Sequence, residues 1–155
     1  MLEHQIHYIK FFLKSELNAL YSSVVLRDLA FSMVGIFVPL YLFIELKYSL
    51  GFIILFYLIY SLAYGIFLFP SSKLVDLLSF KYILLFSSPF YIAYFVLLDL
   101  IPTYTWLFYL VPFLLGAADS FFWLGFHFEF SEVSDYKQRG KEIANWYNLS
   151  LFSGL

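Results

Sequence analysis

The chain has 155 residues, of which 63% are hydrophobic and 13% are charged, with a formal net charge of −2 at pH 7 and no cysteine. A soluble domain of this size could not bury so much apolar surface, so the composition indicates an integral membrane protein. The low charge and the scattered basic residues do not suggest a nucleic-acid partner, and the lack of cysteine excludes disulfides and thiolate metal sites.

Residues 1–18 carry charges throughout and lack the small-residue cleavage site of a secretory signal peptide. From Met1 to Leu20, apolar residues recur at steps of three and four, at Ile6, Ile9, Leu13, Leu17 and Leu20. This pattern predicts an amphipathic helical arm that lies on the cytoplasmic surface of the membrane.

Residues 19–155 contain the long apolar runs and are expected to form the transmembrane domain. Four runs approach or exceed the roughly 20 residues that cross a hydrocarbon core of about 30 Å. They cover residues 19–44, 50–69, 82–98 and 105–130. A fifth run, 143–155, would rise only about 20 Å as a helix and could not span. We therefore expect an N-terminal fragment that begins at a true start, Met1, and ends artificially at Leu155.

The four runs are too long for membrane β-strands, which need only about ten residues and alternate in polarity. Helices suit lipid better, because each helix satisfies its own backbone hydrogen bonds. Pro39 and Pro112 fall inside two of the runs, which membrane helices tolerate and soluble helices generally do not. The sequence therefore predicts an all-α integral membrane protein, a polytopic helical bundle.

Lysine and arginine in the short connections predict the orientation, because they favour the cytoplasmic side. One side carries Lys10, Lys14, Lys73, Lys81, Lys137, Arg139 and Lys141. The other side carries Lys47, and no basic residue falls around residues 99–105. We therefore expect a cytoplasmic N-terminus and a location in the plasma (inner) membrane.

Arg27 and Asp28 are the first candidates for a functional site. A helix that began only at Leu29 would be too short to span comfortably, so the first helix is expected to begin near Ala19 and to contain both charges. One interpretation is a charge in the transport pathway. The other is a snorkelling interfacial arginine with a local aspartate partner.

Asp119 lies in the middle of the fourth run, directly after Gly116-Ala117-Ala118. An ionised carboxylate in lipid costs several kcal/mol, so Asp119 should face protein, water or a basic partner. The first and fourth helices would bring Arg27 and Asp119 to similar depths, where the two could pair. A role in a functional cavity is the interpretation we favour, and a structural polar contact is the alternative.

His127 and Glu129 stand near the cytoplasmic end of the same run. A titratable histidine there could relay protons, whereas the simpler interpretation is an interfacial polar cap. The three histidines show no metal-ligand spacing, so no metal site is predicted. No phosphate-binding loop, dinucleotide-binding glycine turn or Ser/His/Asp arrangement is visible, so no cofactor and no enzymatic activity are predicted.

The connection after the second run, Ser72-Lys73-Leu74-Val75-Asp76-Leu77-Leu78-Ser79-Phe80-Lys81, resembles the signature G-x-x-x-D-R-x-G-R-R of the major facilitator superfamily of secondary transporters. Asp76 matches, Lys81 falls on a basic position, and Leu77 departs from the usual arginine. The turn Arg139-Gly140-Lys141 is also similar to one in the family. The resemblance implies a cytoplasmic gating loop that involves Asp76, Lys81 and Arg139.

The resemblance also implies the N-terminal six-helix half of a protein with about twelve helices, built from inverted repeats. Its first and fourth helices would line the pathway, which places Arg27, Asp28, Asp119 and His127 along it. The expected partners are the lipid bilayer and a small-molecule solute, alone or with a coupling proton or cation. Pro112 stands where family members that couple to protons carry an arginine, so drug–proton antiport is not implied.

Two alternatives to a transporter remain from the sequence. One is an integral membrane enzyme that uses Asp119, His127 and Glu129 as acid–base groups on lipid-like substrates. It would need polar residues converging from several helices, whereas these three lie on one. The other is a non-catalytic membrane scaffold, in which Arg27 and Asp119 would serve stability alone.

Overall fold

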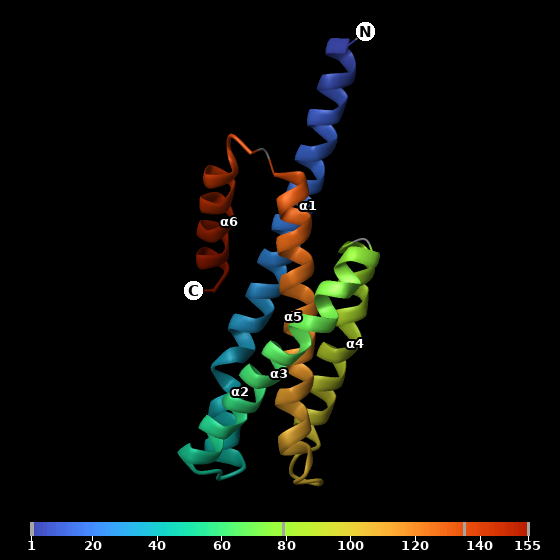
Figure 1. The fold of residues 1–155 in the computed structure, drawn as a ribbon. Helices are drawn as coiled ribbons and strands as arrows, with labels where there is room; N and C mark the ends of the chain where they lie inside the picture. Colours follow the sequence, from blue (N-terminus) through green and yellow to red (C-terminus); the bar gives the residue numbers. More distant parts are fainter. Residues whose placement is uncertain (1, 79, 135, 155) are drawn as a thin grey trace. The chain divides into compact units, whose positions relative to one another are not determined.

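The computed structural model describes residues 2–78, 80–134 and 136–154, and every element within these ranges is helical (Figure 1). In chain order the elements are α1 (Leu2–Gly35), α2 (Phe37–Leu40), the π-helix η1 (Tyr41–Glu45), α3 (Leu50–Leu77), α4 (Phe80–Asp99), α5 (Leu107–Val133) and α6 (Arg139–Gly154).

Four segments of the described chain are long and apolar enough to cross a membrane: Leu17–Glu45, Leu50–Val75, Tyr82–Asp99 and Leu107–Val133. They coincide with the four runs expected from the sequence, although the boundaries shift. The largest shift of a C-terminal end is in α3, which continues past Pro70 to Leu77 instead of ending at Phe69. Proline removes one backbone donor, and neighbouring helices in a membrane protein can compensate for that loss.

The first apolar run is interrupted rather than continuous. α1 extends from Leu2 to Gly35 without a break at residue 18, and a turn at Ile36 separates it from α2. The π-helix η1 follows directly, and its last turn is closed by the Leu46 N–H, which donates to the Tyr41 carbonyl at 3.1 Å. Side chains of residues 2–16 lie outside the described part, so the amphipathic arm stays a prediction.

The chain divides into two compact units. The first unit contains Met1–Val38 and Glu129–Leu155. Within it α6 packs along α1, and the Tyr21 hydroxyl donates to the Glu142 carbonyl at 3.0 Å. The second unit, Pro39–Phe128, contains α3, α4 and most of α5, and it holds the best-defined polar centre.

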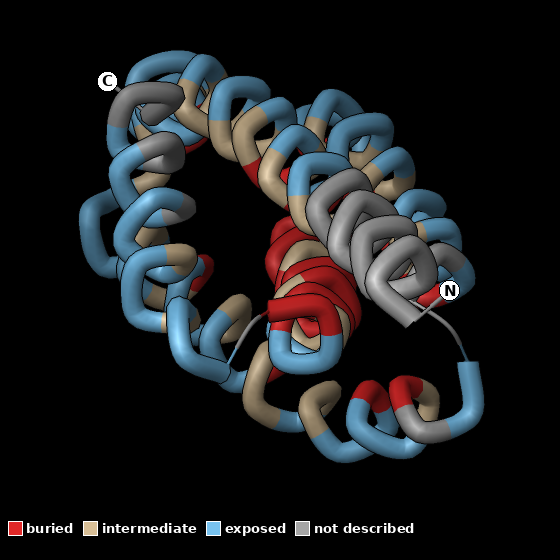
Figure 2. The backbone as a smooth tube through the Cα atoms, turned by 90° about the horizontal axis from the view of Figure 1, so that it is seen from above, coloured by how far each residue is buried: buried red, intermediate tan, exposed pale blue. Residues whose placement is uncertain are grey.

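α5 is the most buried of the four long helices. In its most apolar stretch 67% of the residues are buried, against 11 to 17% in the other three. Figure 2 shows the same contrast, with most buried positions on one helix and mainly exposed or intermediate positions on the others. Buried Ala117 and Phe121 of α5 join Val75 and Ile83 in one apolar cluster of the second unit.

The outer face of α3 shows why this fold needs a lipid solvent. Its exposed apolar side chains recur every three or four residues, at Leu50, Ile54, Leu58, Leu62, Ile66 and Phe69. Such a continuous apolar stripe would be costly in water and has no cost in hydrocarbon. We call these six residues the lipid-facing stripe.

The opposite face of α3 lies against α5 at backbone distance. A Cβ atom built on Gly116 would lie 2.5 Å from the Tyr60 carbonyl oxygen, 2.7 Å from the Tyr64 nitrogen and 2.8 Å from the Ala63 Cβ. Only glycine therefore fits at this position. Small residues are the usual device for close helix contacts in membranes, and here they bring α3 next to the segment that carries Asp119.

Candidate functional site

Asp119 is the centre of the site in the second unit. Its side chain is on α5, only 6% of its surface is exposed, and each carboxylate oxygen accepts a tyrosine hydroxyl. Tyr60 of α3 donates to Oδ2 at 2.8 Å, and Tyr91 of α4 donates to Oδ1 at 2.5 Å. The carboxylate therefore links three helices through two short, charge-assisted hydrogen bonds.

The local sequence explains how the two tyrosines reach this carboxylate. Gly116 lets α3 approach α5 closely, and Tyr60 is one of the residues at that contact. Ala117 and Ala118, which lie between Gly116 and Asp119 on α5, are fully buried. Their short side chains leave room for the phenol rings. A buried carboxylate without donors would be strongly unfavourable, and the two hydroxyls offset much of that cost.

A second polar contact joins α3 and α5 beside Asp119. The hydroxyl oxygens of Ser71 and Ser120 are 3.0 Å apart, and both side chains are fully buried. Ser120 also donates to the Ala117 carbonyl at 3.1 Å. Because a hydroxyl has one proton, Ser120 then accepts from Ser71. The interface between α3 and α5 thus contains a carboxylate and a pair of hydroxyls, and each of these polar groups has a hydrogen-bond partner within the second unit.

Arg27 and Asp28, in the first unit, lie next to each other on α1 and form an ion pair. The Arg27 Nη1 is 3.2 Å from the Asp28 Oδ1, and the guanidinium carbon lies 4.7 Å from the centre of the Phe31 ring. A local aspartate partner was one of the two interpretations open from the sequence. The pairing of Arg27 with Asp119 stays a prediction, because the two residues belong to different units.

His127 is exposed on α5 and takes part in an aromatic cluster of its own helix. Its ring stacks on Trp123 at a centroid distance of 5.9 Å and an interplanar angle of 28°, and it meets Phe126 edge-on at 5.5 Å. These contacts fix the orientation of the imidazole by i,i+4 and i,i+1 neighbours. Proton relay by His127 remains a prediction.

The predicted gating loop is described only in part. The side chains of Asp76 and Lys81 lie outside the described residues. Arg139, in the first unit, donates from Nε to the Ser134 hydroxyl at 2.8 Å and from Nη2 to the Ser131 carbonyl at 2.7 Å. It therefore caps the last turn of α5, where a cation is favoured by the helix dipole.

Tyr60 and Tyr91 are the functional-site residues that the sequence did not reveal. The chain has 14 tyrosines, and most fit equally well as interfacial or lipid-facing residues. Nothing in their spacing marks these two, since they meet Asp119 only through the rotation of three packed helices. No group of three His, Asp or Glu side chains that could hold a metal ion occurs among the described residues.

The fold and Asp119 together define a polytopic helical membrane protein with a charged group buried between its helices. The family model described as Major Facilitator Superfamily matches residues 20–154, and the chain belongs to this family. It is accordingly a transporter domain of that superfamily, whose members move small solutes across membranes. Comparisons with curated proteins and with solved structures gave no match. The resemblance seen in the sequence is thereby confirmed.

Proposed function

We propose that this protein moves a small solute, alone or with a coupling proton or cation, by alternating access. The first membrane span and α5 line the pathway, the N-terminus is cytoplasmic, and the host membrane is the plasma (inner) membrane. Residues 1–18 form a cytoplasmic amphipathic arm, and residues 19–155 belong to the transmembrane domain. Two halves of the complete protein would rock around a site near the midplane.

One observation carries this proposal: an ionisable side chain, Asp119, is buried inside the most buried of the apolar helices. Ionisable groups in such helices are costly and rare, and they mark solute or ion pathways by default. A helix that served only to anchor the protein would have no need for a carboxylate with dedicated donors from two neighbours.

The other proposed residues are assigned roles by their places along the chain. Arg27 and Asp28 supply charges from the first span, and His127 lies beyond Asp119 on α5. Asp76, Lys81 and Arg139 form the cytoplasmic gate. The contact of Arg139 with the end of α5 supports this role, because it ties the gate region to the helix that carries Asp119.

Cysteine accessibility tests the proposal without knowledge of the solute. The chain has no cysteine, so single cysteines can be placed at Asp119 and Asp28 in the protein expressed from its complete gene, after removal of any others. Right-side-out and inside-out vesicles are then treated with a membrane-impermeant thiol reagent. Alternating access predicts that both positions react from both sides. Reaction from one side only, or from neither, would contradict the assigned pathway.

Two exposed positions serve as sidedness controls for the same experiment. Lys137 follows α5 and Tyr104 precedes it, and both are exposed. Lys137→Cys should react only in inside-out vesicles and Tyr104→Cys only in right-side-out vesicles. The reverse result would overturn the proposed orientation and leave the alternating-access test itself valid.

A further inference from the structure

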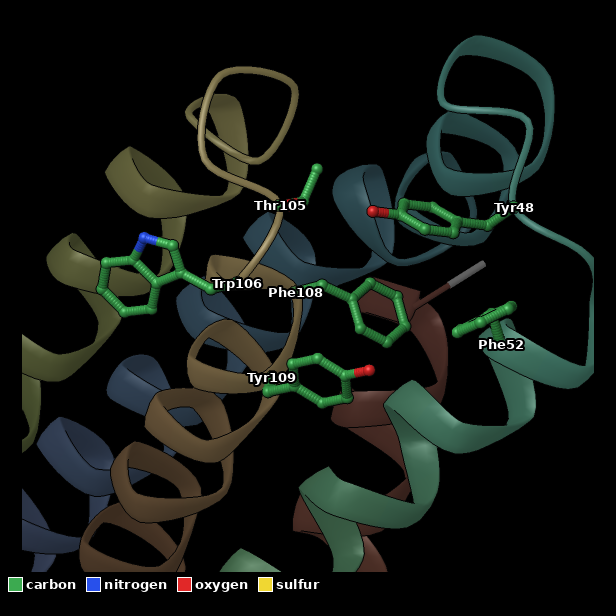
Figure 3. A pocket seen from close by; sticks show the side chains of 6 residues that line it. All are labelled: Tyr48, Phe52, Thr105, Trp106, Phe108 and Tyr109. Atoms are coloured by element: carbon green, nitrogen blue, oxygen red, sulfur yellow. The ribbon is translucent and has the colours of Figure 1, made fainter.

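A pocket of about 440 Å³ opens at the end of the second unit where α3 and α5 begin. Its lining residues are Tyr48, Phe52, Thr105, Trp106, Phe108 and Tyr109. In Figure 3 the rings of Tyr48, Phe52, Phe108 and Tyr109 gather together, while Trp106 points to the other side of its loop. The proposed pathway uses none of these residues, so the pocket calls for a separate explanation.

Tyr48 is held over the pocket by a tight turn. The preceding residue, Lys47, has a φ of 56°, a left-handed conformation that is uncommon for any residue with a side chain. The Tyr48 N–H donates to the Leu42 carbonyl at 3.0 Å. The Tyr48 ring then rests on the buried Phe108, with ring centroids 4.8 Å apart. The Tyr48 side of the pocket is therefore positioned by a backbone hydrogen bond and by the contact of its ring with Phe108.

The facing wall is fixed in the same way. The Leu107 N–H donates to the Tyr104 carbonyl at 3.0 Å, and the Phe108 N–H donates to the Thr105 carbonyl at 3.1 Å. Phe108 meets Tyr109 edge-on at 5.3 Å. It also meets Phe52, from the first wall, edge-on at 5.9 Å. Backbone hydrogen bonds thus position both segments, and their rings contact one another through Phe108. The volume is within the range of about 300 to 1,000 Å³ typical of ligand pockets.

The chemistry of the lining favours an organic cation. The faces of phenol and phenyl rings are electron-rich, and they attract a cation that sits over them. Among the described residues, no lysine, arginine or carboxylate lines the pocket, so an anion would find no charged partner from them there. The adjoining segments carry exposed Glu45 at the end of η1, exposed Asp99 at the end of α4, and exposed Lys47 directly before Tyr48.

We propose that this aromatic pocket binds a quaternary ammonium group. Such a cation is large and weakly hydrated, so it can leave water for ring faces more cheaply than a primary ammonium can. The group could belong to a phosphatidylcholine headgroup in the adjoining leaflet or to a free solute such as choline. The site is independent of Asp119, and transport could fail or succeed without affecting it.

The test uses choline and its uncharged isostere, 3,3-dimethyl-1-butanol, which has the same shape around a carbon instead of a nitrogen. The protein from its complete gene is placed in nanodiscs of phosphatidylethanolamine and phosphatidylglycerol. Saturation-transfer NMR from aromatic protons to the ligand methyl protons reports contact with the rings. Saturable transfer to choline, at least severalfold above that to the isostere, is the expected result. Equal transfer to both ligands, or saturable transfer to neither, would overturn the proposal.

Two variants locate the signal in the pocket. Tyr48→Leu and Tyr109→Leu each remove a ring and should weaken choline binding roughly two- to fivefold. Tyr109 is 53% exposed, so its replacement should leave folding intact even if that of Tyr48 does not. The matched control is Tyr104→Leu, because Tyr104 is similarly exposed at 54% and does not line the pocket. Unchanged binding in both pocket variants would overturn the assignment.

A final arm distinguishes the two sources of the cation. Nanodiscs that contain phosphatidylcholine should abolish choline binding if the lipid headgroup occupies the pocket, because the lipid is present at high local concentration. Undiminished choline binding in these nanodiscs supports a free solute as the ligand. Both results support a quaternary ammonium site, and the isostere comparison decides whether such a site exists.

Discussion

One face of α3 (Leu50–Leu77) meets α5 through backbone atoms and hydroxyls, whereas the opposite face presents mainly large apolar side chains. The inner face contains Tyr60, Ala63 and Ser71, each in direct contact with a residue of α5. The lipid-facing stripe has no polar group at all. Apolar side chains gain little by leaving hydrocarbon for a protein interior, so specificity between membrane helices depends on close packing and hydrogen bonds.

This contrast predicts that substitutions of similar size will have unequal effects on the two faces. Stability can be measured as the free energy of unfolding in mixed micelles titrated with sodium dodecyl sulfate. The protein is the product of the complete gene in every case. Each substitution has a control within the same helices.

Gly116→Ala should have the largest effect. The added methyl group would meet backbone atoms of α3 at 2.5 and 2.7 Å, and backbone cannot rotate away. We expect α3 and α5 to separate at this level, with a loss of about 2 to 3 kcal/mol of stability. Gly65→Ala in α3 is the control, because nothing lies within 4 Å of its added Cβ, and it should be neutral or slightly stabilising. Equal effects of the two substitutions would refute the close contact.

Tyr91→Phe and Tyr60→Phe should each cost about 1.5 to 2 kcal/mol, because each removes a hydrogen bond to a buried charged group. The double-mutant cycle with Asp119→Ala separates this interaction from packing, because alanine leaves no acceptor for the tyrosine hydroxyls. A coupling energy near zero for both tyrosines would show that the carboxylate does not hold the three helices together. Tyr57→Phe is the control in α3, because Tyr57 is 37% exposed, and it should change stability by less than about 0.5 kcal/mol.

Ser71→Ala should have a smaller effect, since it removes one neutral hydrogen bond between α3 and α5. Contacts of this kind in membrane proteins are worth about 0.6 kcal/mol on average. Ser61→Ala is the control: Ser61 is exposed and donates to the Tyr57 carbonyl of its own helix at 2.9 Å. If Ser61→Ala cost as much as Ser71→Ala, the contact between helices would contribute nothing specific.

The sequence was sufficient for the helical class and the four spans, because run length alone decides which segments can cross the membrane. It also singled out Asp119, since a charge within an apolar run is conspicuous. Helix ends were less accurate at Pro70, which the helix passes through, and at Ile36, where it breaks. Pro70 lies inside a continuous helix, whereas Pro39 lies just after the break at Ile36. A proline is compatible with either outcome, and neighbouring helices, which a local sequence pattern does not describe, decide between them.

The hydrogen-bond partners of Asp119 could not be predicted from the sequence, for a related reason. A uniformly apolar helix has no amphipathic pattern that shows how it is rotated about its own axis. The sequence therefore could not predict which faces of α3 and α4 contact α5. Gly116 was the one local clue to a close contact, and its meaning became clear only from the position of Tyr60 and Ala63. Arg27, in contrast, forms an ion pair with the adjacent residue, Asp28, and this local pair was one of the two interpretations drawn from the sequence.

Leu58→Ala should have the smallest effect of the series. Leu58 belongs to the lipid-facing stripe and is 52% exposed, so the lost side chain is replaced by lipid and leaves no cavity. We expect a change of less than about 0.5 kcal/mol, against the roughly 2 to 5 kcal/mol typical of a buried leucine in a soluble core. The comparison within α3 is Phe56→Ala, because Phe56 is fully buried and packs edge-on against Phe108 at 5.6 Å. If Leu58→Ala proved as costly as Phe56→Ala, the stripe would be covered by protein, and the division of α3 into a lipid face and a protein face would be wrong.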